Sequence, residues 1–213
     1  MGLRQREPGP ESANNWWPPV VVSLVAVVAQ VLATGAPTLL RFDRAAIRSG
    51  EVWRLVSGHL VHLGWSHLLM NVIGLLLVFG LVGAAFRTAQ WVLVALITIV
   101  VIDFGFWFLL PGLNWYVGLS GLLHGLLGAG IVGSLMQGGT RHWELWILAV
   151  LVAVKLVYEH LSGALPGSAG VAGGNVIVEA HLYGAIGGVA AGLLVSRFSQ
   201  RQHTVPHGRE PHD

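Results

Sequence analysis

Six apolar runs divide this chain, each separated from the next by polar or glycine-rich residues. They cover residues 20–33, 68–85, 91–110, 120–136, 143–158 and 176–195. The longer runs reach the roughly 20 residues that an α-helix needs to cross the hydrocarbon core of a bilayer. We therefore predict an all-α polytopic membrane protein in which six transmembrane helices form a bundle. The run at 120–136 is short for a full crossing, so its first residues are expected to lie below the outer membrane surface.

The segment from residue 35 to residue 65 interrupts this pattern. It is long, rich in aromatic residues and too polar to span a membrane, and it holds four arginines: Arg41, Arg44, Arg48 and Arg54. Apolar and basic residues in such a mixture are typical of short helices lying in the headgroup region, with arginine side chains that extend outward to water. We predict a structured interfacial first loop.

Positive charge sets the orientation of the predicted helices. Arginine is absent from the loops at 111–117 and 162–175 but occurs in both termini and in the loops on their side. Because cytoplasmic loops carry an excess of Lys and Arg, both termini are expected in the cytoplasm, in a membrane of the bacterial inner-membrane type. The arginines of the first loop are an exception, because this orientation places them outside. The chain then divides into a cytoplasmic tail at 1–15, a membrane domain at 16–196, and a cytoplasmic tail at 197–213 that is expected to be disordered.

The composition agrees with a membrane protein and excludes several kinds of site. Hydrophobic residues make up 54% of the chain, charged residues make up 10%, and the mean hydropathy is +0.68. No cysteine is present, which excludes disulfides, thiolate metal sites and cysteine catalysis. The net charge of +2 is carried mainly by the ends and loops, without a basic stripe interleaved with aromatic residues. The lipid bilayer is therefore an expected partner and nucleic acid is not.

The start of the fourth run places a hydroxyl group inside an apolar segment. Ser120 is flanked by Gly118 and Gly121, which leave room for a foreign backbone to approach its oxygen. Ser120 is therefore a candidate nucleophile. The alternative interpretation is that Ser and Gly are ordinary packing residues of membrane helices.

A histidine near the start of the sixth run is the candidate base. His181 shares a helix face with Gly184, Gly188 and Gly192, which follow it at three, seven and eleven residues. The fourth run carries a similar ridge of glycines at 121, 125 and 128, so the two ridges can meet and bring His181 beside Ser120. A serine hydroxyl becomes a good nucleophile when a neighbouring imidazole takes its proton, and no acidic third group is required.

Two polar residues on the second run are candidates for an oxyanion hole. His67 and Asn71 are four residues apart and therefore project from one face of a helix. Together with the backbone N–H of Ser120 they can donate hydrogen bonds toward a common point. The alternatives are an interfacial role for His67 and an interhelical hydrogen bond for Asn71.

Four motifs occur along the chain in a fixed order. They are GEVWRL at 50–55, His62 and His67 followed by Asn71, GLSG at 118–121, and AHxxGxxxG at 180–188. Each is weak alone, but together they resemble the rhomboid family of intramembrane serine proteases over nearly the whole chain. The resemblance implies a six-helix bundle of the rhomboid type.

The resemblance also assigns roles. It implies that Ser120 is the nucleophile, that His181 is the general base, and that His67, Asn71 and the Ser120 amide stabilise the oxyanion. It further implies that three residues brace the first loop: Glu51, Trp53 and Arg54. The expected activity is an endopeptidase without metal, cofactor or ATP that cleaves a membrane-anchored protein substrate within or near its transmembrane segment.

His124 departs from the common family pattern, in which a tyrosine follows the nucleophile by one turn. GLSG followed by HG is similar to the rhombosortase branch, whose clients are exported proteins ending in a Gly-Gly motif, a hydrophobic helix and a basic tail. Four residues beyond Ser120 on a helix, His124 is expected to lie beneath His181. Three roles are open for His124: it can stack on His181, it can orient His181 by a hydrogen bond, or it can contact the substrate. A charged imidazolium there would be costly, so we expect His124 to be neutral and to support the site. Gly118 and Gly121 are also expected to be supporting residues.

The remaining charged residues of the apolar runs give weaker signals. Asp103 and Lys155 can pair between helices, and Glu179 can lie at a water-filled mouth of the site. Glu159 and His160 are candidates for gate or substrate contacts, and metal binding is not expected of them without a fixed geometry.

Two other classes of function remain open. One is a catalytically inactive relative that binds membrane clients, which would be expected to lack Ser or His at the active positions. The other is a proton-linked transporter, which would be expected to show inverted repeats and broken helices.

Overall fold

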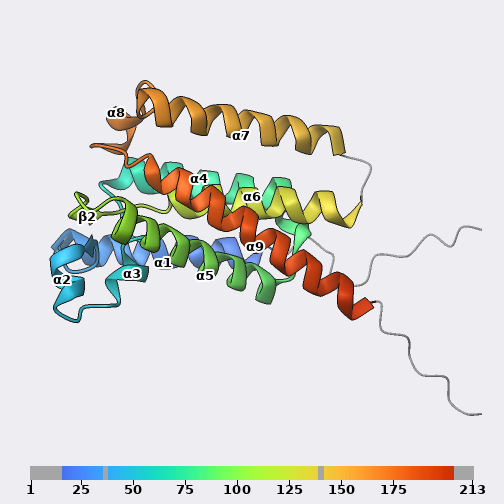
Figure 1. Ribbon diagram of the computed structural model, residues 1–213. Helices are drawn as coiled ribbons and strands as arrows, with labels where there is room; N and C mark the ends of the chain where they lie inside the picture. The colour runs from blue at the N-terminus through green and yellow to red at the C-terminus, as the bar shows by residue number, and fades with distance from the viewer. Residues whose placement is uncertain (1–15, 36–37, 139–141, 204–213) are drawn as a thin grey trace, which may run out of the picture.

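A computed structural model describes residues 16–35, 38–138 and 142–203 of the chain. Within these residues, six long helices run alongside one another (Figure 1). They are α1 (Trp17–Gly35), α4 (Trp65–Val82), α5 (Thr88–Phe104), α6 (Ser120–Gln137), α7 (His142–Ser162) and α9 (Glu179–His203). The predicted tail at 1–15 lies outside the described residues, whereas α9 continues past the predicted domain boundary at 196 as far as His203.

The predicted helical membrane bundle is confirmed, with one difference at α6. Five of the long helices among the described residues are apolar enough to cross a membrane, and α6 is not one of them. Its sequence holds His124, Gln137 and five glycines. α6 tolerates this composition because it packs against α4, α5, α7 and α9 and is largely buried in protein. The protein is thus a multi-pass membrane protein with a buried, glycine-rich helix packed among the others.

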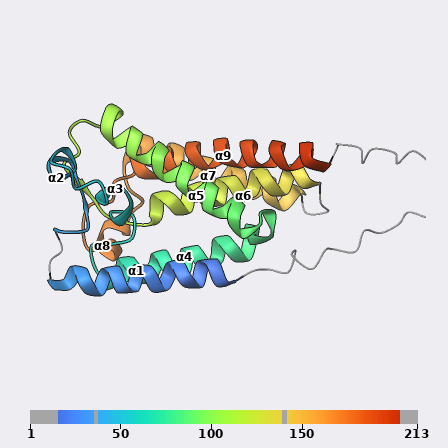
Figure 2. The ribbon, with the colours of Figure 1, turned by 90° about the horizontal axis from the view of Figure 1, so that it is seen from below.

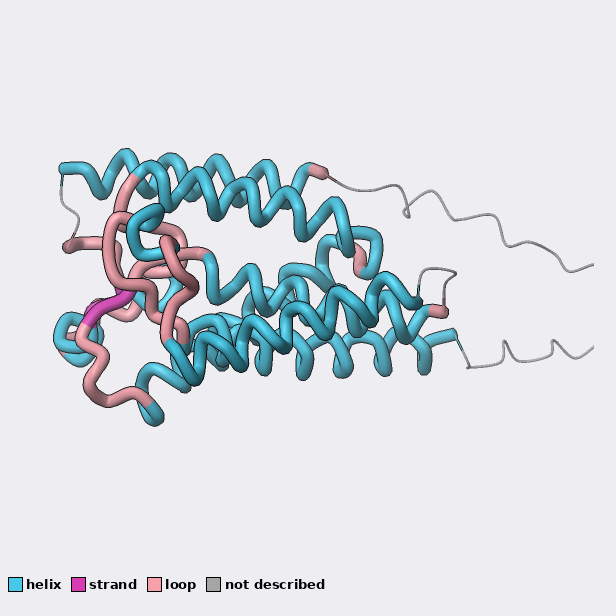
Figure 3. The backbone as a smooth tube through the Cα atoms, turned by 90° about the horizontal axis from the view of Figure 1, so that it is seen from above, coloured by secondary structure: helices cyan, strands magenta, loops and turns pink. Residues whose placement is uncertain are grey.

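The short elements gather at one end of the bundle, opposite the end at which α1 begins and α9 ends (Figures 2 and 3). They are β1 (Phe42–Asp43), α2 (Arg44–Arg48), α3 (Arg54–Ser57), β2 (Trp115–Tyr116) and α8 (Ser168–Ala172). A 3₁₀ turn (Gly83–Ala85) and a π-helical turn (Gly105–Leu109) follow α4 and α5. β1 and β2 are antiparallel, with Phe42 opposite Tyr116, so the first loop is fixed directly to the segment that leads into α6.

Two arginines hold the first loop together from inside, which corrects the prediction that its arginines extend outward. Arg54 is 4% exposed, bonds the Glu51 carboxylate at 2.6 and 2.8 Å, and donates to the carbonyls of Thr38 and Arg41. Arg44 donates to four carbonyls around the end of α5, those of Phe106, Trp107, Leu110 and Leu113. A helix end leaves several carbonyls without partners, and one guanidinium with five donors can satisfy them together.

The brace implied for GEVWRL is therefore present in the Glu51–Arg54 pair. The third residue of that brace, Trp53, is 52% exposed and reaches only the Leu39 carbonyl, at 3.4 Å. The rigidity of this loop thus comes from the guanidinium groups and not from the indole.

The glycine ridges of α6 and α9 meet as predicted. A Cβ atom on Gly184 would lie 2.0 Å from the carbonyl oxygen of Gly121, and one on Gly188 would lie 1.9 Å from that of Gly125. Both distances are far below van der Waals contact, so only glycine permits this approach. The main chains of α6 and α9 are in direct contact from the first turn of each helix.

Helix α7 is attached to the bundle differently. Only 6% of its apolar window is buried, against 44% for α9. α7 lies along one side of the bundle (Figure 1). The short helix α8 follows it, and there the Val171 carbonyl accepts a hydrogen bond of 2.7 Å from Ser66 at the start of α4. Most of the surface of α7 is therefore available to lipid.

Candidate active site

The nucleophile candidate opens α6. Ser120 is the first residue of the helix, so its backbone N–H is among those that have no partner within the helix. Gly118, two residues earlier, has φ +131°, a conformation that favours glycine, and its carbonyl accepts a bond of 2.6 Å from the Tyr116 hydroxyl. A hydrogen-bonded turn that requires glycine thus fixes the direction in which the serine enters the bundle.

His181 and Ser120 lie within hydrogen-bond distance. Nε2 of His181 is 3.0 Å from Oγ of Ser120. His181 is the third residue of α9, one turn before the contact of Gly184 with Gly121, so the direct backbone contact sets the distance between the two side chains. The imidazole is 5% exposed. This is the geometry that a base needs to take the serine proton.

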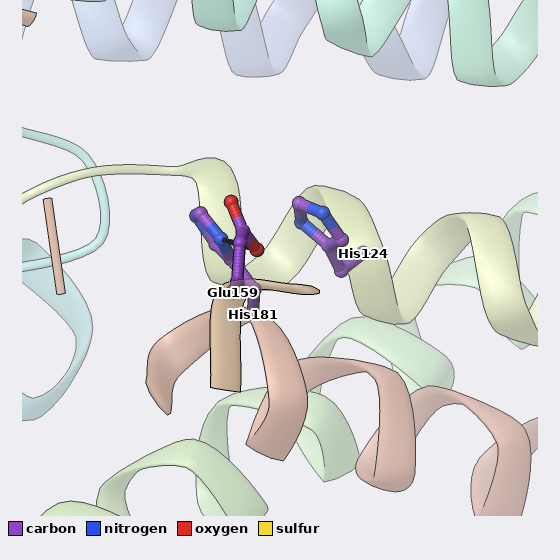
Figure 4. Close-up of side chains that lie close together, drawn as sticks. All are labelled: His124, Glu159 and His181. Carbon is purple, nitrogen blue, oxygen red and sulfur yellow. Dashed lines mark hydrogen bonds and ion pairs between the residues drawn. The ribbon is translucent and has the colours of Figure 1, made fainter. Parts of the chain in front are cut away.

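His124 lies beneath His181, as the one-turn spacing predicts. The rings of His124 and His181 (Figure 4) stack with their centroids 4.3 Å apart and their planes inclined by 18°. Nδ1 of His124 is 2.7 Å from the Ser120 carbonyl. A carbonyl only accepts, so Nδ1 of His124 must carry the proton of this bond. The bond orients the His124 ring from the backbone of Ser120.

A carboxylate on α7 contacts the far side of His181. An oxygen of Glu159 is 2.8 Å from Nδ1 of His181, and Nζ of Lys155 is 2.7 Å from the same oxygen (Figure 4 shows Glu159). Sequence reasoning assigned Glu159 to gate or substrate contacts and did not connect it with His181. The spacing of four between Lys155 and Glu159, near the end of a helix, was the available signal of an ion pair.

Asp103 and Lys155 do not pair with each other, contrary to one sequence expectation. Lys155 bonds Glu159, whereas Asp103 on α5 lies 3.3 Å from Nε2 of His59, a buried residue that follows α3. The His59 ring also packs edge-on against Tyr116. The Asp103 carboxylate therefore supports the turn before the nucleophile and is not part of a relay between helices.

The two oxyanion candidates take different positions on α4. The His67 ring lies against Gly118, where a Cβ atom would come within 3.0 Å of its Cε1. Nδ1 of His67 is 3.4 Å from the Leu63 N–H, which leaves Nε2 to carry the proton of a neutral ring. Asn71 is 4% exposed and donates one amide hydrogen to the His67 carbonyl at 2.9 Å, so its second amide hydrogen stays available.

A cavity of about 260 Å³ opens beside this site. Its walls are the segment 112–117, which leads to the nucleophile, together with Leu63, Asn175 and Ile177. The cavity lies among the loops at the end of the bundle where Ser120 begins α6, but Ser120 and His181 are not among its lining residues.

His124, Glu159 and His181 place one possible metal-ligand atom each within 4.8 Å of one another. Stacking makes this group a poor metal site. Imidazole lone pairs lie in the ring plane, and two nearly parallel rings 4.3 Å apart cannot both direct a lone pair at one ion about 2.1 Å away. The direct Glu159–His181 hydrogen bond fits an acid–imidazole pair better.

Comparison with known proteins gives matches over most of the chain. Residues 49–198 match the family model described as Rhomboid domain. The "Putative rhomboid protease YdcA" of Bacillus subtilis (strain 168) is 25% identical over 160 residues, which are 74% of each chain. The "Uncharacterized protein Rv1337" of Mycobacterium tuberculosis (strain ATCC 25618 / H37Rv) is 29% identical over 158 residues, which are 70% of this chain and 62% of the relative.

Proposed function

The chain belongs to the rhomboid family, and we propose that it is an intramembrane serine protease with Ser120 as nucleophile and His181 as general base. The observation that carries the proposal is the 3.0 Å separation of His181 Nε2 and Ser120 Oγ. A half-buried serine and a buried imidazole at this distance, at the start of a helix, are the minimal parts of an acyl-transfer site.

The chemistry proceeds in two halves. His181 takes the Ser120 proton while Oγ bonds to the carbonyl carbon of the scissile peptide, which gives a tetrahedral oxyanion. The C–N bond then breaks, His181 gives the proton to the leaving amine, and an acyl ester remains on Ser120. Water attacks the ester with His181 again as base, releasing the new carboxyl end and restoring Ser120.

The oxyanion is stabilised by donors that surround the start of α6. We assign this role to the backbone N–H of Ser120, the Nε2 hydrogen of His67 and the free amide hydrogen of Asn71. Their positions support it, because His67 lies against Gly118, and Asn71 lies one turn further along α4. Donors fixed in advance are effective because they need no reorganisation as charge develops.

The substrate is proposed to be an exported protein with a single membrane span near its C-terminus and a glycine-rich segment beside that span. The similarity of GLSGLLHG to the rhombosortase branch supports this class. The cavity lined by the loop 112–117, which leads into α6, supports the entry of a peptide from among these loops. We place the enzyme in a bacterial-type inner membrane with both termini in the cytoplasm, an orientation supported by the arginine-free loops at 111–117 and 162–175.

Covalent labelling tests the assignment of the nucleophile. Purified protein in detergent is treated with a fluorophosphonate probe, and the modified residue is mapped by peptide mass spectrometry. Wild type should label at Ser120, whereas Ser120→Ala should not label and His181→Ala should label at least about a thousandfold more slowly. Folded wild-type protein that does not label would refute the protease, and the same protein retaining client binding would instead favour an inactive client-binding relative.

A further inference from the structure

Glu159 makes the closest polar contact to the nitrogen of His181 that faces away from Ser120. Its oxygen lies 2.8 Å from Nδ1, while Nε2 of the same ring lies 3.0 Å from the serine. The Glu159 side chain is 4% exposed and the His181 side chain 6%. The three groups form a continuous chain from carboxylate through imidazole to hydroxyl, in which the carboxylate and the imidazole are buried.

This contact determines which tautomer His181 adopts. A carboxylate accepts a hydrogen bond, so Nδ1 must carry the proton, and Nε2 is left with a lone pair directed at Ser120. In the opposite tautomer Nε2 would carry a hydrogen and could not take the serine proton. The carboxylate also stabilises the imidazolium that forms during the reaction, and this attraction is stronger in a buried site than in water.

Lys155 holds the carboxylate in place. Its Nζ lies 2.7 Å from the oxygen that contacts His181, and 3.5 Å from Nδ1 itself. Nδ1 of His181 cannot accept a hydrogen bond from Lys155 while it donates its own hydrogen to Glu159. Lys155 therefore bonds the Glu159 carboxylate and not the imidazole. With Glu159 present the two charges offset each other, whereas without it Lys155 would be an unpaired cation beside a base that must become positive.

We propose that Glu159 is a positioning residue that completes a Ser120–His181–Glu159 triad, with Lys155 as the anchor of its carboxylate. The inference rests on the proposed function, since it concerns the same serine and histidine. It replaces the dyad expected from the sequence, which required no acidic member. His124 fixes the face of the His181 ring by stacking, and Glu159 fixes its rotation by an in-plane hydrogen bond.

The test separates the binding and chemical steps of fluorophosphonate labelling. The concentration dependence of labelling gives the maximal rate, kinact, and the apparent binding constant, KI, for wild type, Glu159→Gln, Lys155→Met and the double variant. Glu144→Gln is the matched control, because it removes a carboxylate from the same helix about 22 Å from position 159. Near-ultraviolet circular dichroism of the tryptophans checks that each variant is folded.

Glu159→Gln should lower kinact by roughly 10- to 1,000-fold with KI unchanged within about twofold, because the amide can also donate to Nδ1 and favour the wrong tautomer. Lys155→Met should lower kinact less than about tenfold. The double variant should label faster than Glu159→Gln, because it removes the unpaired cation. A purely structural role does not predict this recovery, since two packing losses would add.

The outcomes distinguish this inference from the proposed function. If folded wild type fails to label, the protease itself is refuted. If wild type labels and Glu159→Gln keeps kinact within twofold, the triad is overturned while the protease stands. If Glu159→Gln does not fold, the electrically neutral double variant decides, and a kinact within twofold of Lys155→Met overturns the triad. A double variant slower than Glu159→Gln overturns the assigned effect of Lys155.

Discussion

Gly184 lies against the carbonyl oxygen of Gly121 so closely that a Cβ atom would be 2.0 Å from that oxygen. This contact comes one residue after Ser120 on α6 and three residues after His181 on α9. The separation of nucleophile and base is therefore set by two main chains in contact.

The first prediction follows from this contact. Gly184→Ala should force α6 and α9 apart and lower the labelling rate of Ser120 by roughly 100-fold, since a displacement of about 1 Å between reacting groups can cost that much. Gly170→Ala in α8 is the control, because a Cβ atom there meets nothing within 4 Å. Equal rates for the two variants would show that side chains, not the backbone contact, position the site.

The second prediction ranks the residues of the site by how much activity is lost when each is replaced. Ser120→Ala and His181→Ala should each reduce cleavage of a substrate by about four orders of magnitude or more, because the two act as one unit. Asn71→Ala should reduce kcat by about 10- to 1,000-fold, since the other oxyanion donors stay in place. Full activity of Ser120→Ala would end the assignment of the nucleophile, and full activity of Asn71→Ala would remove it from the oxyanion hole.

The third prediction concerns His124, which stacks on His181 at 4.3 Å. His124→Tyr keeps an aromatic ring beneath His181 and should retain measurable cleavage, whereas His124→Ala should lose about 10- to 100-fold. The measurement is cleavage of one substrate by the three proteins at equal expression. If His124→Tyr proved as inactive as Ser120→Ala, the imidazole would have a catalytic or substrate-selecting role.

The fourth prediction uses His62, which precedes α4 and is 6% exposed. Burial, together with the nearby His67, lowers the pKa of His62 from 6.5 to about 3. The unfolded chain therefore binds a proton at His62 more readily than the folded protein does. The stability contributed by neutral His62 is complete above pH 6.5 and is lost as the pH falls from 6.5 toward 3.

Between pH 7 and pH 5 this residue alone should cost about 2 kcal/mol of folding free energy. The measurement is the thermal midpoint in one detergent at the two pH values. His62→Phe should reduce the drop in midpoint, and His160→Gln, at an exposed position of α7, should not. An unchanged pH dependence in His62→Phe would show that His62 does not titrate in this range.

The fifth prediction concerns the substrate. A helix hides its carbonyls in its own hydrogen bonds, so the cleaved segment must unwind, and glycine lowers the cost of unwinding. In a client with a single C-terminal span, replacing two glycines at the site by leucine should slow processing about tenfold, since each change favours the helix by roughly 1 kcal/mol. Processing is measured by the shift in client mass. If it stayed unchanged, helix flexibility would not select the substrate.

The parts of this site that could be predicted from sequence are those encoded by short spacings on one helix. The glycine ridges predicted that α6 and α9 meet, and the spacing of His124 from Ser120 predicted its position beneath His181, while stacking was one of three open roles. The contact of Glu159 with His181 was not recognised, because the two residues lie on α7 and α9, which are separated by a connection of sixteen residues that includes α8. The spacing of residues within one helix does not predict such a contact. Arg44 was misjudged for a similar reason, since the carbonyls that bind it lie more than sixty residues away.

Helix α7 has the smallest buried share among the five apolar spans, and it carries Glu159. In the triad proposed here, the carboxylate that orients His181 therefore belongs to the helix that buries the smallest share of its residues in the bundle. Any client segment that moved this helix aside to reach Ser120 would remove the acid from His181 at the same moment.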